Sequence, residues 1–411
     1  MSFSVSILVS ILLIFLLELY FYKKLKKVVI NLFPRINFKK FRLITWIALG
    51  YINIYPVLMF FARLYYSVIL DQRPELPEGI WFDIFILFPF WVAALTMLQT
   101  VIYFLVLDII KLLILPIYKR YKTKILPYEA KLLLVMIGFF IIYSPARIAY
   151  DYYFVSVRPV ELVKKDLPPS LENFKIVFVS DIQADKYTNN KRLDNYISKI
   201  NELNPDLVLM AGDIITGTPK YINLAAEYTG KIKSKYGVFT CVGDHDNWAY
   251  REDTKKSIRE ITAALGKKNV KMVDNGKEII NVNNADIGIT FVTNTYVEKI
   301  NPDILLNLVN GNKEHDLRIF LTHQPRTELI LAATENKYDM FLAGHTHGGQ
   351  VTFLFPFINL SPTLIETKYV RGTFYIDDML MIVTRGLGMS LVPIRFNSTP
   401  EITVINVTGK R

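Results

Sequence analysis

The hydrophobic pattern divides the chain into two halves. In the first 150 residues, apolar side chains form four long runs, at residues 6–22, 43–70, 80–117 and 132–143. A helix of about 20 apolar residues is long enough to cross a bilayer. From residue 174 onward the apolar runs shorten and alternate with amphipathic segments, a pattern typical of an α/β fold. The pattern predicts a four-span α-helical transmembrane domain at 1–150, a linker at 151–170 and an α/β domain at 171–411.

The third apolar run is too long for one upright helix and barely long enough for two. The segment before it, 71–78, is acidic, and the segment after it, 119–131, is basic. Because basic loops stay on the cytoplasmic side, an odd number of crossings must separate them. We therefore predict one long span, tilted or kinked near Pro89. Four spans in total place the second half of the chain on the extracytoplasmic side.

Short apolar strands in the second half each end at polar side chains. The predicted strands are 175–180, 206–211, 237–242, 317–322 and 341–343, with helices near 192–203 and 224–232. The carboxyl ends of strands in an α/β fold gather at one edge, so the residues that follow them converge. The candidate metal ligands found there are Asp181, Gln183, Asp213, Asp244, His323, His345 and His347.

The last of these strands runs into the sequence GHTHGGQ, residues 344–350. His345 and His347 project to the same side if the backbone is extended, and the flanking glycines allow a close approach to a charged centre. An isolated pair of this kind also occurs in ordinary polar turns. Five strand ends with potential ligands in a single domain favour the metal site.

The charge distribution excludes one class of partner. The chain has a formal net charge of +11, but residues 23–42 contain eight basic side chains and no acidic one, and residues 119–131 contain five basic side chains against one acid. The positive charge therefore belongs to the membrane half and indicates topology, not a nucleic-acid surface. Cys241 is the only cysteine, so the chain forms no internal disulfide.

The polar strand ends resemble the calcineurin-like metallophosphoesterase superfamily, whose pattern is DxH, GD, GNHD, a lone H and GHxH. The matching residues are Asp181, Gly212-Asp213, Gly243-Asp244-His245-Asp246, His323 and Gly344-His345-Thr346-His347. The nearest resemblance is to the membrane-anchored bacterial branch, in which GHTHGGQ is followed by segments like 383–388 and 393–396. The resemblance implies a two-layer β-sandwich flanked by helices.

The resemblance also implies a binuclear metal site and a metal-dependent hydrolysis of a phosphate ester by an activated hydroxide. Asp213 would bridge the two ions, with Asp181 and His347 completing one site. The other site would comprise Asp244, His323 and His345. His245 would stabilise the transition state or protonate the leaving oxygen, and Asp246 would orient its ring.

Two positions depart from the family pattern. Gln183 stands where the family has the histidine of DxH, which predicts a weaker first site or a glutamine that binds only a metal-bound water. Asp244 stands where the family has asparagine, which adds negative charge to the second site. We expect two divalent ions, Mn²⁺ or Fe²⁺ in preference to Zn²⁺, with Zn²⁺ left open.

The apolar segment 351–360 follows the GHTHGGQ loop directly. Exposed, it would suit a membrane surface or a lipid tail; buried, it would be a core strand. Confinement to the membrane favours a phospholipid or lipid-linked phosphate ester as substrate. The alternative function is a catalytically weak or inactive phosphate-binding sensor or scaffold at the membrane.

Overall fold

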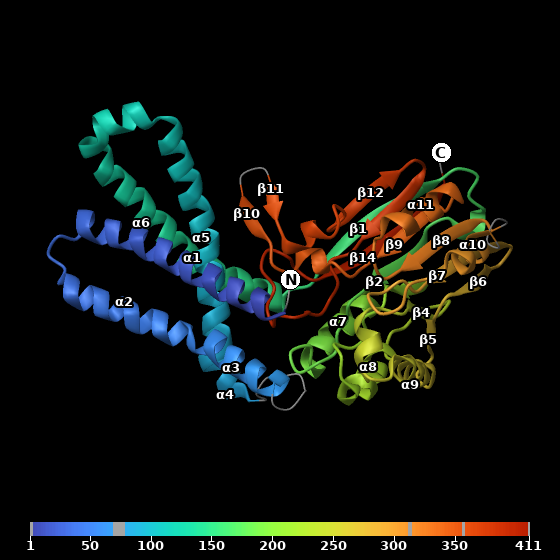
Figure 1. The fold of residues 1–411 in the computed structure, drawn as a ribbon. Coiled ribbons are helices and arrows are strands. Elements are labelled where there is room, and N and C mark those ends of the chain that lie inside the picture. The colour runs from blue at the N-terminus through green and yellow to red at the C-terminus, as the bar shows by residue number, and fades with distance from the viewer. Residues whose placement is uncertain (1–2, 69–78, 311–314, 356–357, 410–411) are drawn as a thin grey trace. The chain divides into compact units, whose positions relative to one another are not determined.

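The computed structural model describes residues 3–68, 79–310, 315–355 and 358–409. The chain forms two compact units, each shown in Figure 1: Met1–Ala149 with Leu354–Ile358, and Tyr150–Phe353 with Asn359–Arg411. Each unit is described by itself.

The first unit is built from helices. They are α1 (Phe3–Leu32), α2 (Phe38–Ile52), α3 (Ile54–Val68), α4 (Ile80–Phe82), the π-helical turn η1 (Asp83–Leu87), α5 (Phe88–Leu113) and α6 (Leu115–Tyr153). Among the described residues, three helical stretches are long and apolar enough to cross a membrane: Phe38–Tyr66, Ile80–Leu113 and Leu115–Tyr153. Helix α1 covers the first predicted span. These apolar helices support membrane association.

A short break in the helical backbone lies inside the third predicted span, 80–117, because α5 ends at Leu113 and α6 begins at Leu115. Helix continues from Ile80 to Leu113 through the π-helical turn, which lies just before Pro89. The basic segment 119–131, predicted as a loop, is instead helical within α6, which has non-helical dihedral angles at Tyr121 (φ −109°, ψ 15°). Lysine, arginine and leucine lose little rotamer freedom in a helix, so the basic charge of this segment did not identify a loop. The acidic segment 71–78 lies outside the described residues.

Ion pairs join three helices of this unit. The Nζ atom of Lys24 in α1 lies 2.5 Å from Oδ1 of Asp108 in α5. Lys27 and Lys111 both reach the carboxylate of Glu129 in α6, at 2.6 and 2.7 Å. Because each of these carboxylates is paired, part of the basic charge is held between helices instead of being spread over loops.

The second unit is a sandwich of two six-stranded sheets. One sheet has the order β1 (Ser156–Lys164), β14 (Glu401–Gly409), β2 (Phe174–Val179), β3 (Leu207–Met210), β4 (Val238–Cys241), β5 (Val270–Val273). The other has the order β12 (Gly372–Ile376), β13 (Met379–Val383), β9 (Met340–Ala343), β8 (Leu317–Thr322), β7 (Ala285–Val292), β6 (Gly276–Val282). The helices are α7 (Asn190–Glu202), α8 (Ile222–Thr229), α9 (Thr254–Gly266), α10 (Pro302–Asn310) and α11 (Thr327–Glu335). Short 3-10 turns are η2 (Pro169–Leu171), η3 (Pro219–Tyr221), η4 (His245–Trp248), η5 (His347–Gly349) and η6 (Pro362–Ile365).

Alternation of side chains along the strands builds this sandwich. In β2, Ile176 and Phe178 join the cluster between the sheets, whereas Val177 and Val179 join the cluster that includes Leu193 of α7. This is the two-residue period of a strand that is buried on both faces. A third cluster packs α11 against the outer face of the second sheet. The predicted fold, a two-layer β-sandwich flanked by helices, is confirmed.

The segment predicted as a linker contributes a strand. Residues Ser156 to Lys164 form β1, which pairs in parallel with β14 from Glu401 to Gly409. Pro159 is tolerated because β1 is an edge strand. Pairing with a partner some 245 positions away is not visible in a local hydrophobic pattern.

The apolar segment after the GHTHGGQ loop is partly packed. It forms the two-stranded sheet of β10 (Phe353–Phe355) and β11 (Ile358–Leu360). Phe353 is buried, and the backbone of Leu354 exchanges hydrogen bonds of 2.8 and 2.9 Å with the Gln99 side chain of α5, in the first unit. Ile358 and Leu360 are exposed, and residues 356–357 lie outside the described residues.

Candidate metal centre

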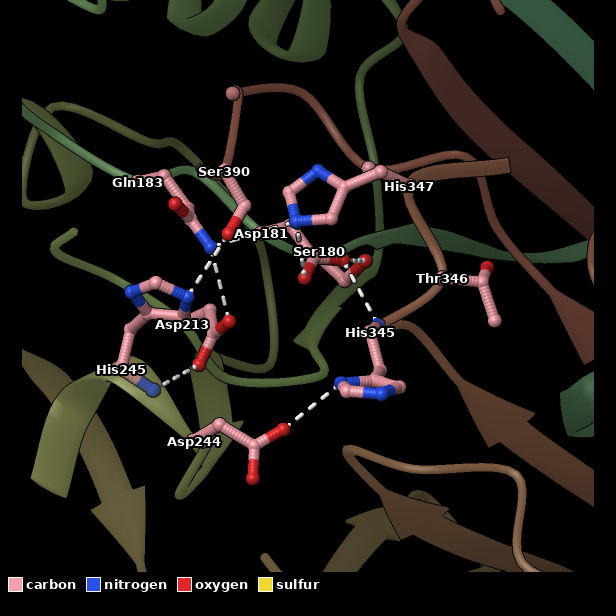
Figure 2. Close-up of polar contacts among 12 residues, drawn as sticks. Ser180, Asp181, Gln183, Asp213, Asp244, His245, His345, Thr346, His347 and Ser390 are labelled. Atoms are coloured by element: carbon pink, nitrogen blue, oxygen red, sulfur yellow. Dashed lines mark hydrogen bonds and ion pairs between the residues drawn. The ribbon is translucent and has the colours of Figure 1, made fainter. Parts of the chain in front are cut away.

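The strand ends bring the predicted site residues together, as Figure 2 shows for most of them. Asp181 and Gln183 follow β2, Asp213 follows β3, Asp244 to Asp246 follow β4, His323 follows β8, and His345 and His347 follow β9. Strands β2, β3 and β4 run parallel in one sheet, and β8 and β9 run parallel in the other. Their carboxyl ends therefore deliver side chains from both sheets to one place.

Unusual backbone conformation marks this place. Five of the predicted metal residues have left-handed φ angles: Asp181 (51°), Gln183 (48°), Asp213 (55°), His345 (70°) and His347 (48°). This conformation costs a non-glycine residue about 1–2 kcal/mol. Such strain gathers at functional sites, where the surrounding structure must hold it in place.

Asp181 keeps one carboxylate oxygen free. Its Oδ2 accepts hydrogen bonds from the Ser180 hydroxyl and from the backbone N–H of His345, the latter at 3.1 Å. Its Oδ1 is buried without a hydrogen-bond partner and lies 3.4 Å from Nε2 of His347. The first oxygen fixes the carboxylate, and the second is directed into the site.

His323 lies between two carboxylates. Its Nδ1–H donates to the Ala211 carbonyl at 2.6 Å, so the lone pair of the neutral ring is on Nε2. That nitrogen is buried without a hydrogen-bond partner, 3.3 Å from Oδ2 of Asp213 and 3.2 Å from Oδ2 of Asp244. The other oxygen of Asp213 accepts a hydrogen bond of 2.7 Å from the backbone N–H of His245.

These residues fit a pair of divalent cations. Two groups have ligand atoms within 4.8 Å of one another: Asp244, His323 and His345, and Asp181, Asp213 and His323. Three buried atoms lack a hydrogen-bond partner although they are good ligands: Oδ1 of Asp181, Oε1 of Gln183 and Nε2 of His323. A mixed set of carboxylates and imidazoles suits Mn, Fe or Zn.

Gln183 and His347 are placed differently from the other candidates. The carboxamide nitrogen of Gln183 donates to Oδ2 of Asp213 at 3.0 Å and lies 3.4 Å from Nε2 of His347. In this orientation Gln183 supports the Asp213 carboxylate with its N–H, not with its oxygen. The Nδ1 atom of His347 lies 3.4 Å from the buried guanidinium of Arg395.

The two sides of the site differ in electrostatics. Burial lowers the pKa of His347 to about 4, and Arg395 adds to this effect. Burial alone would also lower the pKa of His345, but its hydrogen bonds to Asp244 and Glu366 raise that pKa to about 9. The carboxylates of Asp213 and Asp244 likewise raise the pKa of His323 well above its usual value, against the effect of burial. The side with His323 and His345 therefore attracts positive charge much more strongly than the side with His347.

Both ring nitrogens of His245 have a polar partner. Its Nδ1–H donates to the Thr216 carbonyl, and its Nε2 lies 3.0 Å from Oγ of Ser390. Asp246 was predicted to orient this ring, but in the structure it accepts three backbone hydrogen bonds of 2.9 Å, from Asp213, Ile214 and Gly243. Asp246 thus fixes the loops that carry Asp213 and Asp244. Burial and the nearby Asp213 raise its pKa to about 6.

Two glycines are required by close packing around Asp181 and Gln183. A Cβ atom on Gly344 would lie 2.7 Å from Oδ2 of Asp181, and one on Gly388 would lie 2.7 Å from Cβ of Gln183. Gly388 belongs to the segment 383–388, so this segment packs against the site loop.

Several residues at the site were missed by sequence reasoning. They are Gln324, Arg326, Glu366, Tyr296, Ser390 and Arg395. Gln324 directly follows His323 and Arg326 lies three positions after it, so closeness in sequence to a predicted ligand is a usable signal. Glu366 and Tyr296 lie in loops without any pattern, so only the tertiary structure reveals them.

Comparison with known proteins agrees with the geometry. Residues 174–349 match the family model described as calcineurin-like phosphoesterase. A metallophosphoesterase of Campylobacter jejuni is 27% identical over 359 residues, which cover 86% of this chain and 88% of that protein. One of Bacillus subtilis is 29% identical over 59% of this chain and 81% of its own length.

A third relative comes from an animal. A zebrafish (Danio rerio) protein named as a transmembrane protein with a metallophosphoesterase domain is 27% identical over 61% of this chain and 56% of its own length. Its name agrees with the apolar helices of this chain. The second unit of this chain carries a domain of the calcineurin-like phosphoesterases, a family of metal-dependent phosphoric ester hydrolases.

Proposed function

We propose that this chain is a multi-pass membrane enzyme that hydrolyses a phosphate ester of a phospholipid or lipid-linked substrate at a binuclear metal centre. The single observation that carries the hydrolase assignment is the convergence of Asp181, Asp213, Asp244, His323 and His345, in which Oδ1 of Asp181 and Nε2 of His323 are buried without a hydrogen-bond partner.

Each side chain has a role in this proposal. Asp213 would be shared by both cations: it forms one ligand group with Asp181 and His323, and its Oδ2 lies 3.3 Å from Nε2 of His323, which also belongs to the Asp244 group. Asp181 and His347, with Gln183 beside them, would hold one cation, and Asp244, His323 and His345 the other. Divalent cations, Mn²⁺ or Fe²⁺ in preference to Zn²⁺, would supply Lewis acidity toward the phosphoryl oxygens and lower the pKa of water.

His245 would serve the leaving group. Its Nδ1–H is committed to the Thr216 carbonyl, so Nε2 is the nitrogen that can carry a proton toward the substrate. Before substrate binds, the hydroxyl oxygen of Ser390 can accept a hydrogen bond from a proton on Nε2.

A chromogenic phosphodiester assay with added Mn²⁺ tests the enzyme. We expect turnover by the wild type, and a strong loss for both Asp213→Asn and His245→Ala. Phosphate binding without turnover, or activity that survives both substitutions, would favour the sensor or scaffold function instead.

The lipid substrate is supported by the rim of the site. Ile365 and Leu391 are 94% and 93% exposed. Each is next in sequence to a residue that contacts a site histidine: Glu366 with His345, and Ser390 with His245. Aliphatic side chains so fully exposed suit contact with acyl chains, and the same chain carries apolar membrane helices.

Substitution at this rim tests the substrate class. In nanodiscs, Ile365→Ser with Leu391→Ser should lower activity on an embedded lipid phosphate severalfold while activity on a soluble ester is retained. Leu331→Ser, at an exposed position of α11, is the matched control. Equal losses on both substrates would count against the lipid substrate.

The extracytoplasmic location rests on the two basic segments of the membrane unit. It can be tested with Cys241 replaced by alanine and a single cysteine introduced at exposed Glu335 or exposed Lys39. A membrane-impermeant maleimide on intact cells should label the variant at 335 and leave the variant at 39 unlabelled. The reverse pattern would place the catalytic domain in the cytoplasm.

A further inference from the structure

A closed ring of polar contacts surrounds one half of the metal centre. It begins at Asp244, whose two carboxylate oxygens both accept from Nε2 of Gln324, at 2.8 and 2.7 Å. Oε1 of Gln324 accepts from Nε of Arg326 at 2.7 Å, and Nη2 of Arg326 donates to Oε1 of Glu366, also at 2.7 Å. Glu366 then meets Nε2 of His345 at 3.2 Å.

The ring closes on the ligand atoms themselves. Nδ1 of His345 lies 2.8 Å from Oδ2 of Asp244, a contact drawn in Figure 2. The two nitrogens of His345 thus have separate partners, with Nδ1 directed at the centre and Nε2 at the Glu366 carboxylate.

Tyr296 makes a second bridge across the same ring. Its backbone N–H donates to Oδ1 of Asp244 at 2.6 Å, and its hydroxyl donates to Oε1 of Glu366, also at 2.6 Å. Two independent bridges therefore connect Asp244 to Glu366, one through Gln324 and Arg326 and one through Tyr296.

We propose that Gln324, Arg326, Glu366 and Tyr296 form a positioning frame that fixes Asp244 and His345 and sets how tightly this half of the centre holds its cation. The inference deepens the proposed function, since it rests on a cation being bound there. Partners behind metal ligands fix the ring orientation of a histidine and raise its basicity, and losing one weakens metal affinity by about 10–100-fold.

Charge adds a second role for Arg326. Asp244 and Glu366 place two carboxylates in one network, and Arg326 is the cation that pairs with Glu366 at 2.7 Å. Without Arg326, Glu366 would add an uncompensated negative charge behind His345, and Gln324 would lose the donor that orients its amide. Arg326 thus orients the side chains of Gln324 and Glu366 and compensates the negative charge of Glu366.

The test measures Mn²⁺ binding to the purified full-length protein, without any turnover. Titration calorimetry and metal analysis give the number of sites and their affinities, and electron paramagnetic resonance reports whether two Mn²⁺ ions are close enough to couple. Glu366→Gln keeps the shape of the side chain and removes its charge. Glu335→Gln, an exposed position at the end of α11, is the matched control.

We expect the wild type and Glu335→Gln to bind two Mn²⁺ ions with a coupled signal. Glu366→Gln should weaken one of the two sites by at least tenfold and leave the other unchanged, so that the coupled signal is lost at two equivalents of Mn²⁺. An affinity and a signal equal to those of Glu335→Gln would overturn the frame. A wild type that binds no Mn²⁺ would instead overturn the proposed metal centre.

Arg326 provides a second arm in case Glu366→Gln is poorly folded. Arg326→Lys retains the charge, but one ammonium group cannot replace both the Nε contact with Gln324 and the Nη2 contact with Glu366. The affinity of the same site should fall in the order wild type, Arg326→Lys, Arg326→Met, with Arg259→Met, at an exposed position of α9, unchanged. Equal affinities across this series would also overturn the frame.

Discussion

The two halves of the candidate metal centre surround their histidines with different polar groups. Asp244 and His345 are each fixed by polar neighbours that make further hydrogen bonds of their own. Two carboxylates, those of Asp244 and Glu366, contact the His345 ring. Around His347, the neighbours are the carboxylate of Asp181, the amide of Gln183 and the guanidinium of Arg395. The first half attracts protons in the absence of metal, and the second repels them. The comparison indicates that the two proposed cation sites differ in charge and in how rigidly their ligands are held.

Loss of His323 should have the largest effect, because its Nε2 is close to both Asp213 and Asp244. His323→Ala removes an imidazole ligand, and because losing a mere partner behind a ligand weakens metal affinity by about 10–100-fold, we expect a loss of more than about a hundredfold. His345→Ala should affect only one ion. Metal analysis after dialysis compares the two variants, and an equal loss of metal from both would show that His323 matters no more than His345.

The next largest effect should come from acidification, which should weaken cation binding at the His345 half more than at the His347 half. The pKa of His345 is raised to about 9, so below that pH the metal-free ring is protonated and a cation must displace the proton. Affinity at this half should rise with pH up to about 9, by roughly tenfold per pH unit for one released proton. The pKa of His347 is lowered to about 4, so this ring stays neutral at higher pH.

Calorimetric titrations at a series of pH values in buffers of different ionisation enthalpy measure both affinities and the protons released. A common pH slope for both sites would show that the halves are not electrostatically distinct.

Gln183→His should make the cation affinities of the two halves more similar. An imidazole in place of the amide offers a better ligand to a borderline metal, and we expect the weaker of the two affinities to rise by roughly tenfold, about 1.4 kcal/mol. Gln183→Asn shortens the side chain without adding an imidazole and serves as the control. Competition with a fluorescent chelator gives the affinities, and an unchanged weak site would show that residue 183 does not face the metal.

Ser390→Ala should have the smallest effect and leave the metal content of both halves unchanged. Its hydroxyl lies 3.0 Å from Nε2 of His245, and one neutral hydrogen bond contributes about 0.5–1.5 kcal/mol. We expect kcat to change by no more than about tenfold with metal content unaltered. A drop in bound metal would mean that Ser390 supports the centre and not the His245 ring.

Local pattern was enough to find the strand ends. The strands before Asp181, Asp213, Asp244, His323 and His345 were predicted within one or two residues, because runs of buried aliphatic residues followed by glycine and polar side chains are a local signal. The same reasoning failed at β1, a polar and proline-containing edge strand that depends on β14 for its hydrogen bonds. It also failed at residues 119–131, where basic residues continue a helix.

The sequence by itself determined the division into apolar helices and an α/β domain, and the identity of the side chains that gather at the strand ends. Periodicity and composition are properties of neighbouring residues, so they can be read without a fold. Only the tertiary structure decided which atoms face one another: that Thr216 and not Asp246 orients His245, and that Glu366 stands behind His345. Those contacts join loops far apart in the chain, and their partners are chosen by the packing of two sheets and not by any local preference.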